Sequence, residues 1–164
     1  MEPSENAKKY MALGHASLAA HDIDSTAKYW QMAMEEYAPY QSFYFVIANA
    51  YLEAGQRDKA YAFYLKSVEN DPSHEQAFYE LALCDMYNRD WQKAITHFKE
   101  SLKIDPNQAL AHYYLASCYG VLKQHEPAIS NLRRAVAVSP DLLNSLCEGD
   151  VLYPYRNKIE AGTL

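Results

Sequence analysis

The chain has 164 residues, of which 49% are hydrophobic and 22% are charged, with only 5 glycines and 7 prolines. This balance is typical of one folded domain and excludes a disordered or fibrous chain. The formal charge of −6 disfavours the phosphate backbone of a nucleic acid and an anionic membrane surface as partners, so we expect a partner that is neutral or basic overall.

The sequence also indicates a compartment. Residues 1–6 are polar and acidic and precede no apolar run, so we expect no export signal. No run of about 18 apolar residues is present, which argues against a membrane-spanning helix. The three cysteines, Cys84, Cys118 and Cys147, form no CxxC pair and no even set, as expected of free thiols in a reducing compartment. We therefore predict a cytoplasmic protein.

A short motif that ends in proline recurs with a period of 34 residues. It appears as Asp71-Pro72, Asp105-Pro106 and Ser139-Pro140, and one period earlier the proline is displaced by one position, at Pro39. A fixed period of this length indicates a repeat architecture. We predict a flexible N-terminus, four repeats and a C-terminal capping segment or tail, at residues 1–6, 7–40, 41–74, 75–108, 109–142 and 143–164.

Each repeat contains two stretches with helical spacing. In the first stretch a large apolar residue is followed at once by a small one, as in Ile47-Ala48. In the second, a small residue precedes a bulky one by four positions and another small one by seven, which places all three on one helix face. Polar turns separate the two stretches, so each repeat is predicted to be a hairpin of two helices of roughly 12–14 residues.

These spacings predict the core of an all-α fold, because two helices approach closely only where one side chain is small. In the first helices the expected large core residues are Leu13, Ile47, Leu81 and Leu115, and the small residues that follow them are Gly14, Ala48, Ala82 and Ala116. In the second helices the first small residues are Thr26, Ala60, Ala94 and Ala128, and the bulky residues are Trp30, Tyr64, Phe98 and Leu132. The second small residues there are Ala33, Ser67, Ser101 and Ala135.

The period and two local patterns resemble the tetratricopeptide repeat. The patterns are Y-x-x-I-A-x-x-Y from Tyr44 to Tyr51 and A-x-x-x-Y from Ala60 to Tyr64. The resemblance covers residues 7–142 and is weakest in the first repeat. It implies an α-solenoid, a right-handed superhelix of four helical hairpins with a short C-terminal helix or tail.

The segment after Asp141 is short for a terminal helix. Residues 142–148 can form about two helical turns before Gly149 ends them, and the stretch 151–155 is apolar. The last hairpin of a repeat array exposes an apolar side unless something covers it. We expect the tail to fold back over that side; the alternatives are that it binds a partner or continues into a further region.

Signatures of catalysis are absent from the sequence. It has no GxSxG motif, no phosphate-binding glycine loop and no GxGxxG motif, so we predict a non-catalytic protein without a cofactor. Asp22–Thr26 begins like a calcium loop but lacks the glycine and glutamate that complete one. The six histidines show no metal-ligand spacing, and Cys84 and Cys118 are expected to be small buried residues. We predict no metal site.

The resemblance implies that the first helices of the hairpins line a concave surface on which partners bind. The positions there that the core does not need are mainly aromatic and aliphatic, and an exposed row of such side chains usually marks a binding site. Asn49 could hold a peptide backbone through its amide and carbonyl groups. The candidate partner-binding residues are Met11, His15, Phe45, Asn49, Tyr79, Glu80, Leu83, Tyr113, Tyr114 and Ser117.

The predicted function is therefore protein binding. We expect an adaptor or scaffold, or a chaperone-like protein, that holds an apolar or aromatic peptide segment in its concave groove. One subgroup of the family clamps the terminal carboxylate of acidic chaperone tails with lysine, arginine and asparagine. We do not expect such binding here, because the matching positions hold Met11, His15, Val46, Gln76 and Glu80. The alternative is a structural scaffold that forms homo-oligomers through its C-terminal hairpin and tail.

Overall fold

The computed structural model describes residues 2–160, and every regular element in this range is a helix. The chain forms two compact units that divide between Pro72 and Ser73. The first unit contains α1 (Glu5–Ala19), α2 (Ile23–Glu36), the 3-10 helix η1 (Ala38–Ser42), α3 (Phe43–Glu53) and α4 (Arg57–Asn70). The second contains α5 (Glu75–Tyr87), α6 (Trp91–Ile104), α7 (Ala109–Val121), α8 (His125–Val138), α9 (Asp141–Ser145), η2 (Tyr153–Tyr155) and α10 (Arg156–Glu160). The all-α prediction is confirmed.

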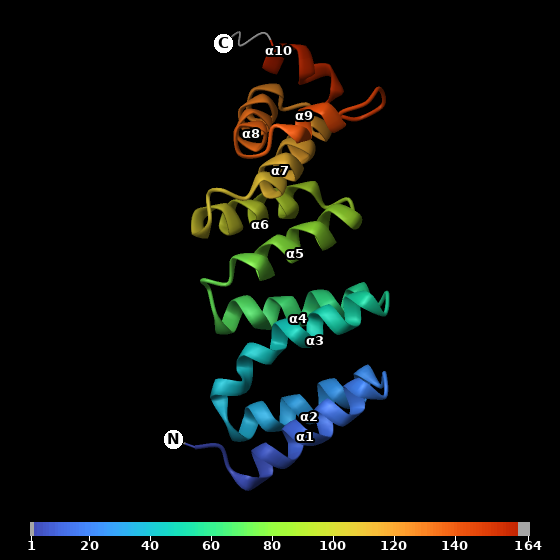
Figure 1. The fold of residues 1–164 in the computed structure, drawn as a ribbon, viewed down its shortest axis with the longest axis vertical. Coiled ribbons are helices and arrows are strands. Elements are labelled where there is room, and N and C mark those ends of the chain that lie inside the picture. Colours follow the sequence, from blue (N-terminus) through green and yellow to red (C-terminus); the bar gives the residue numbers. More distant parts are fainter. Residues whose placement is uncertain (1, 161–164) are drawn as a thin grey trace. The chain divides into compact units, whose positions relative to one another are not determined.

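Consecutive helices within each unit pair as hairpins: α1 with α2, α3 with α4, α5 with α6, and α7 with α8 (Figure 1). Each hairpin falls in one predicted repeat, except that α1 begins at Glu5, inside the segment expected to be flexible. The reason is an N-cap, since the Ser4 hydroxyl oxygen accepts a hydrogen bond from the Ala7 amide at 3.0 Å. Residue 1 of that segment lies outside the described residues.

The predicted core positions are buried almost without exception. Trp30, Tyr64, Phe98 and Leu132 are at most 1% exposed, and the small residues that face them are buried as well. The exception is Leu13, which is 36% exposed because no helix precedes α1 in the described residues to cover it.

The neighbouring Gly14 shows why a small residue is needed next to each bulky one. A Cβ atom at Gly14 would overlap the indole ring of Trp30, which is 1% exposed and has no free space to move into. The first hairpin therefore combines the largest core side chain with the smallest partner, whereas the other hairpins use alanine at the same offset.

The C-terminal segment folds back over the last hairpin of the second unit. Leu146, Leu152 and Tyr155 are buried in the same core cluster as residues of α7 and α8. The Tyr155 hydroxyl lies 2.7 Å from His125 Nδ1 at the start of α8. Gly120 leaves room for the returning chain, because a Cβ atom there would lie 3.1 Å from Val151 Cγ2. Residues 161–164 of the expected tail lie outside the described residues.

None of the helices in residues 2–160 combines the length and the apolar character that a bilayer crossing requires.

Candidate functional site

The candidate residues on α1 differ in exposure. Met11 was expected on the exposed face, but its side chain is only 7% exposed, so that prediction is wrong. The indole N–H of Trp30 donates a hydrogen bond to the Met11 carbonyl oxygen at 3.3 Å, which ties this turn of α1 to α2. His15 is exposed, and its ring lies edge-on to Trp30 and Phe43, with centroids 5.1 and 6.0 Å apart.

The candidate residues on α3, Phe45 and Asn49, both contact Tyr64 of α4. The Tyr64 hydroxyl donates to Asn49 Oδ1 at 2.6 Å, and the Phe45 ring lies 5.6 Å from the Tyr64 ring. Because Tyr64 is fully buried, this hydrogen bond satisfies an interior hydroxyl group. Asn49 therefore offers a partner mainly its amide N–H groups, and not the complete amide that the sequence analysis expected.

Three candidate tyrosines form a continuous aromatic row in the second unit. Tyr79 of α5 lies 6.4 Å from Tyr114 of α7, which lies 5.6 Å from Tyr113. The Tyr114 ring stacks on the buried ring of Phe98, with centroids 6.1 Å apart, so these tyrosines pack against the core and are half-buried. Burial raises the pKa of Tyr79 to about 12, and its hydroxyl group is therefore a protonated donor at neutral pH. We call Tyr79, Tyr114 and Tyr113 the aromatic row.

The other three candidates of the second unit are half-buried beside this row. Leu83 packs against the core cluster. Burial raises the pKa of the Glu80 carboxyl group above its ordinary value. The Ser117 hydroxyl donates to the Tyr113 carbonyl oxygen at 3.0 Å, so it serves its own helix.

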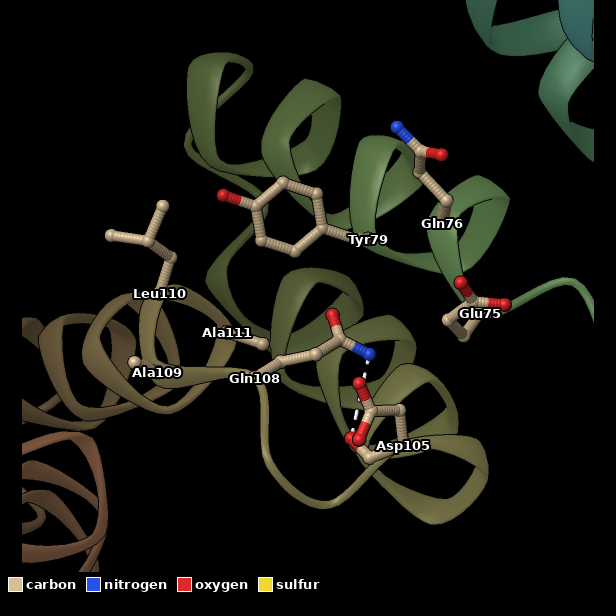
Figure 2. Close-up of a pocket in the computed structure, with 8 residues that line it drawn as sticks. All are labelled: Glu75, Gln76, Tyr79, Asp105, Gln108, Ala109, Leu110 and Ala111. Carbon is tan, nitrogen blue, oxygen red and sulfur yellow. Dashed lines mark hydrogen bonds between the residues drawn. The ribbon is translucent and has the colours of Figure 1, made fainter. Parts of the chain in front are cut away.

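A cavity of about 410 Å³ opens beside Tyr79, between α5 and the start of α7 (Figure 2). Of the ten candidate residues, only Tyr79 lines it. Its lining residues are Glu75, Gln76, Tyr79, Asp105, Gln108, Ala109, Leu110 and Ala111. Helical spacing does not point to most of them, because they lie at helix ends and in the turn between α6 and α7, and not in the middle of a first helix.

Ser101 of α6 fixes the base of this cavity. Its hydroxyl oxygen lies 2.9 Å from the Glu75 carbonyl oxygen and 3.2 Å from Gln108 Oε1. The Gln108 amide group also donates to the Asp105 carbonyl oxygen at 3.4 Å (Figure 2). The first residue of α5 and the turn before α7 are thus tied to one buried side chain. Besides Tyr79, the sequence signal for this site was the hydroxyl group of Ser101, at a position where the hairpin requires only a small residue.

Two of the three cysteines lie in the core, and the described residues form no cluster of metal ligands. Residues 2–160 contain no group of three or more histidine, cysteine or acidic side chains that could hold a metal ion. Cys84 and Cys118 are buried, as predicted, and neither belongs to a disulfide. Burial raises the pKa of the Cys118 thiol to about 12, which keeps it protonated and unreactive.

Comparisons with known proteins agree with this architecture. Models of the tetratricopeptide repeat match residues 41–74 and 75–108. The crystal structure of MamA is similar over 96% of this chain and 86% of the other, with 18% identity and a TM-score of 0.75. MamA 41-end from Desulfovibrio magneticus RS-1 is similar over 99% of both chains, with 16% identity and a TM-score of 0.70.

A further solved structure is that of YrrB, a TPR protein with an unusual peptide-binding site. It is similar over 82% of this chain and 70% of the other, with 18% identity and a TM-score of 0.65. At these identities the similarity to solved structures shows the fold alone. No curated protein matches the chain.

Proposed function

This chain is a tetratricopeptide-repeat protein, and we propose that it is a non-catalytic interaction module of the adaptor or scaffold type. In this proposal a peptide segment of a partner protein binds on the face formed by α5 and α7. The observation that carries the proposal is the aromatic row beside a cavity of about 410 Å³. A cavity of this size takes one large side chain and lies within the usual range for ligand pockets.

The chemistry of this face supports a peptide with apolar or aromatic side chains. Leu110 is 49% exposed at the cavity, next to the half-buried rings of the aromatic row. Tyrosine supplies a large contact area at a small cost in side-chain entropy, and its hydroxyl group can bind a peptide carbonyl. The similarity to YrrB adds support, because that protein has the same fold and a peptide-binding site.

The test is a selection of random dodecapeptides displayed on phage, with the full chain as bait. We expect enrichment of peptides rich in apolar and aromatic residues. Binding of these peptides should weaken by about tenfold or more when Leu110→Ala and Tyr113→Ala are combined, since truncating central contacts of an interface costs most of its affinity. Leu110 is 49% exposed and Tyr113 is half-buried at the edge of the core, so the melting temperature should fall by a few degrees while the helical content is kept.

A matched control removes the same kinds of side chain away from the cavity. Val138→Ala with Tyr153→Ala likewise truncates one aliphatic residue and one tyrosine, which are 46% and 36% exposed. This variant should bind the selected peptides as the unaltered chain does. Absence of enriched peptides, or equal weakening in both double variants, would contradict the proposal.

A second proposal is self-assembly through the C-terminal end. It is favoured by four apolar side chains that are 36% to 40% exposed around the last hairpin and the tail: Val121, Leu122, Val151 and Tyr153. In this case the molar mass measured by light scattering should rise with protein concentration above 18.8 kDa. A molar mass that stays constant with protein concentration would rule out self-assembly and favour the interaction module.

A further inference from the structure

We infer that the cavity between α5 and α7 binds a cationic side chain, arginine or lysine, of the partner peptide. The inference rests on the proposed function, and it adds the chemistry that a partner must carry at one position. It differs from the recognition of acidic tails by the carboxylate-clamp subgroup of the family, in which the charges have the opposite sign.

The first argument is the distribution of charge in the second unit. Neither α5 nor α7 contains a lysine or an arginine. The cavity is lined by the half-buried carboxylates Glu75 and Asp105, and neither forms an ion pair with a described residue. The cations of the four hairpin helices of this unit lie on α6 and α8: Lys93, Lys99, Lys103, Arg133 and Arg134. Asp105 Oδ1 accepts a hydrogen bond from the Asn107 amide at 3.0 Å, which is a neutral donor and leaves the negative charge at the cavity uncompensated by a cation.

The second argument is the shape of the cavity. In Figure 2 the carboxylates of Glu75 and Asp105 lie at one end of the cavity and Leu110 lies at the other, with the ring of Tyr79 between them. Arginine and lysine have an apolar stem and a charged head, so the stem can pack on Leu110 and Tyr79 while the head reaches the carboxylates. An aromatic ring close to a cation adds a favourable electrostatic contact.

An anionic ligand is disfavoured because the negative charge at the cavity exceeds the positive charge there. The first amides of α7, at Ala109–Ala111, line the cavity, and no side chain caps them. A helix N-terminus carries only about half a positive charge. Glu75 and Asp105 together bring two full negative charges to the same space. The summed charge therefore attracts a cation and repels a carboxylate or phosphate group.

The same phage selection on the full chain tests this inference. The enriched peptides should share an arginine or lysine flanked by apolar residues. Synthetic versions in which norleucine replaces that residue should bind about three- to tenfold more weakly, as expected when two part-exposed ion pairs are lost. The difference should shrink as the salt concentration rises, because salt screens exposed charges.

A charge-neutral variant provides the matching test on the protein side. Glu75→Gln with Asp105→Asn should reduce binding of the cationic peptides by the same factor and leave binding of the norleucine versions unchanged. The control is Asp58→Asn with Glu126→Gln, which removes two carboxylates away from the cavity; both are exposed and lie in first turns of other helices. This control accounts for the change in net charge and should have little effect.

The possible outcomes separate the inference from the proposed function. Enriched peptides without a shared basic residue, or a norleucine replacement without effect, would overturn the cationic anchor and leave peptide binding intact. Equal losses in the Glu75 and Asp105 variant and in its control would also overturn it. No enrichment at all would contradict the proposed function and this inference with it.

Discussion

At the scale of single residues, the same strained turn occurs once in every hairpin. His21, Gly55, Arg89 and Lys123 follow the first helices at intervals of 34 residues, and their φ angles lie between 56° and 74°. The residue after each one donates its amide to a carbonyl oxygen five positions earlier, as in Gln56 N to Tyr51 O at 2.8 Å. This is the left-handed helix end that glycine adopts without steric cost, yet only one of the four positions holds glycine.

Replacing the three other residues by glycine should therefore stabilise the protein. His21, Arg89 and Lys123 are exposed, and His21→Gly, Arg89→Gly and Lys123→Gly should each raise the free energy of unfolding by about 0.5–1 kcal/mol. This is the difference between the cost of about 1–2 kcal/mol for a side chain in the left-handed conformation and the entropy cost of about 0.5–1 kcal/mol for glycine. Urea denaturation of the full chain measures the change. Gly55→Ala is the reverse control and should lower stability. A loss of stability in all three glycine variants would show that their side-chain contacts outweigh the backbone strain.

Side-chain size within a repeat could be predicted from the sequence, and the exposure of individual side chains could not. The alternation of small and bulky residues placed Trp30 and Tyr64 correctly in the core, because close helix packing admits few solutions. Met11 was expected to be exposed and is buried, whereas Leu13 was expected in the core and is exposed. Their exposure depends on which faces of α1 are covered, and the spacing of residues along one helix carries no information about that.

At the scale of helices, an acid–base pair joins α5 to α6. Asp85 Oδ2 lies 2.6 Å from His97 Nδ1, and the two side chains are 4% and 17% exposed. Asp85 stands where the repeat family usually has a tyrosine, so a polar contact has replaced an apolar one. A buried pair of this kind contributes little by itself, but the loss of one partner leaves the other without compensation.

The predicted effect is strong coupling between the two positions. His97→Ala should lower the free energy of unfolding by about 2–3 kcal/mol, near the lower end for a broken buried pair, because the histidine is partly exposed. A separate double-mutant cycle uses Asp85→Leu and His97→Leu. The double variant should lose about 1–3 kcal/mol less stability than the sum of the losses in these two single variants. Urea denaturation of the four proteins in this cycle measures the coupling, and additive effects would show that the contact contributes nothing.

The candidate cavity illustrates what helical periodicity misses. The tyrosines were predicted to form an exposed row, because these residues occupy first-helix positions that the hairpin core does not need, and the structure has them half-buried. Asp105 and Gln108 were not predicted to contribute, since they belong to a turn whose evident task is to end α6 and begin α7. Gln108 is held at the cavity by Ser101, which also contacts the start of α5, and the Asp105 carboxylate is held by the Asn107 amide at 3.0 Å.

At the scale of the whole molecule, the repeat pattern continues across the boundary between the two compact units. The boundary falls between Pro72 and Ser73, in the turn between the second and third repeats. The period of 34 residues runs through this turn without interruption. Periodicity describes what one repeat has in common with the next, so it carries no information about where a compact unit begins or ends.

The C-terminal segment has a structural task in the second unit that can be tested by truncation. Leu146, Leu152 and Tyr155 complete the core cluster over α7 and α8, and a chain ending at Asp141 would expose apolar side chains of both helices. We expect light scattering after size exclusion to give a constant mass of 18.8 kDa for the full chain and a mass that rises with concentration for the truncated one.

A point variant separates the loss of the cap from the loss of chain length. Leu152 is fully buried, and Leu152→Ala should lower the free energy of unfolding by about 2–4 kcal/mol, since it leaves a cavity under the returning chain. If the truncated chain stayed monomeric and Leu152→Ala melted as the unaltered protein does, the segment would not be a cap. A mass that rose with concentration already in the full chain would instead make this end an assembly surface, because association would then occur with the core of the last hairpin still covered.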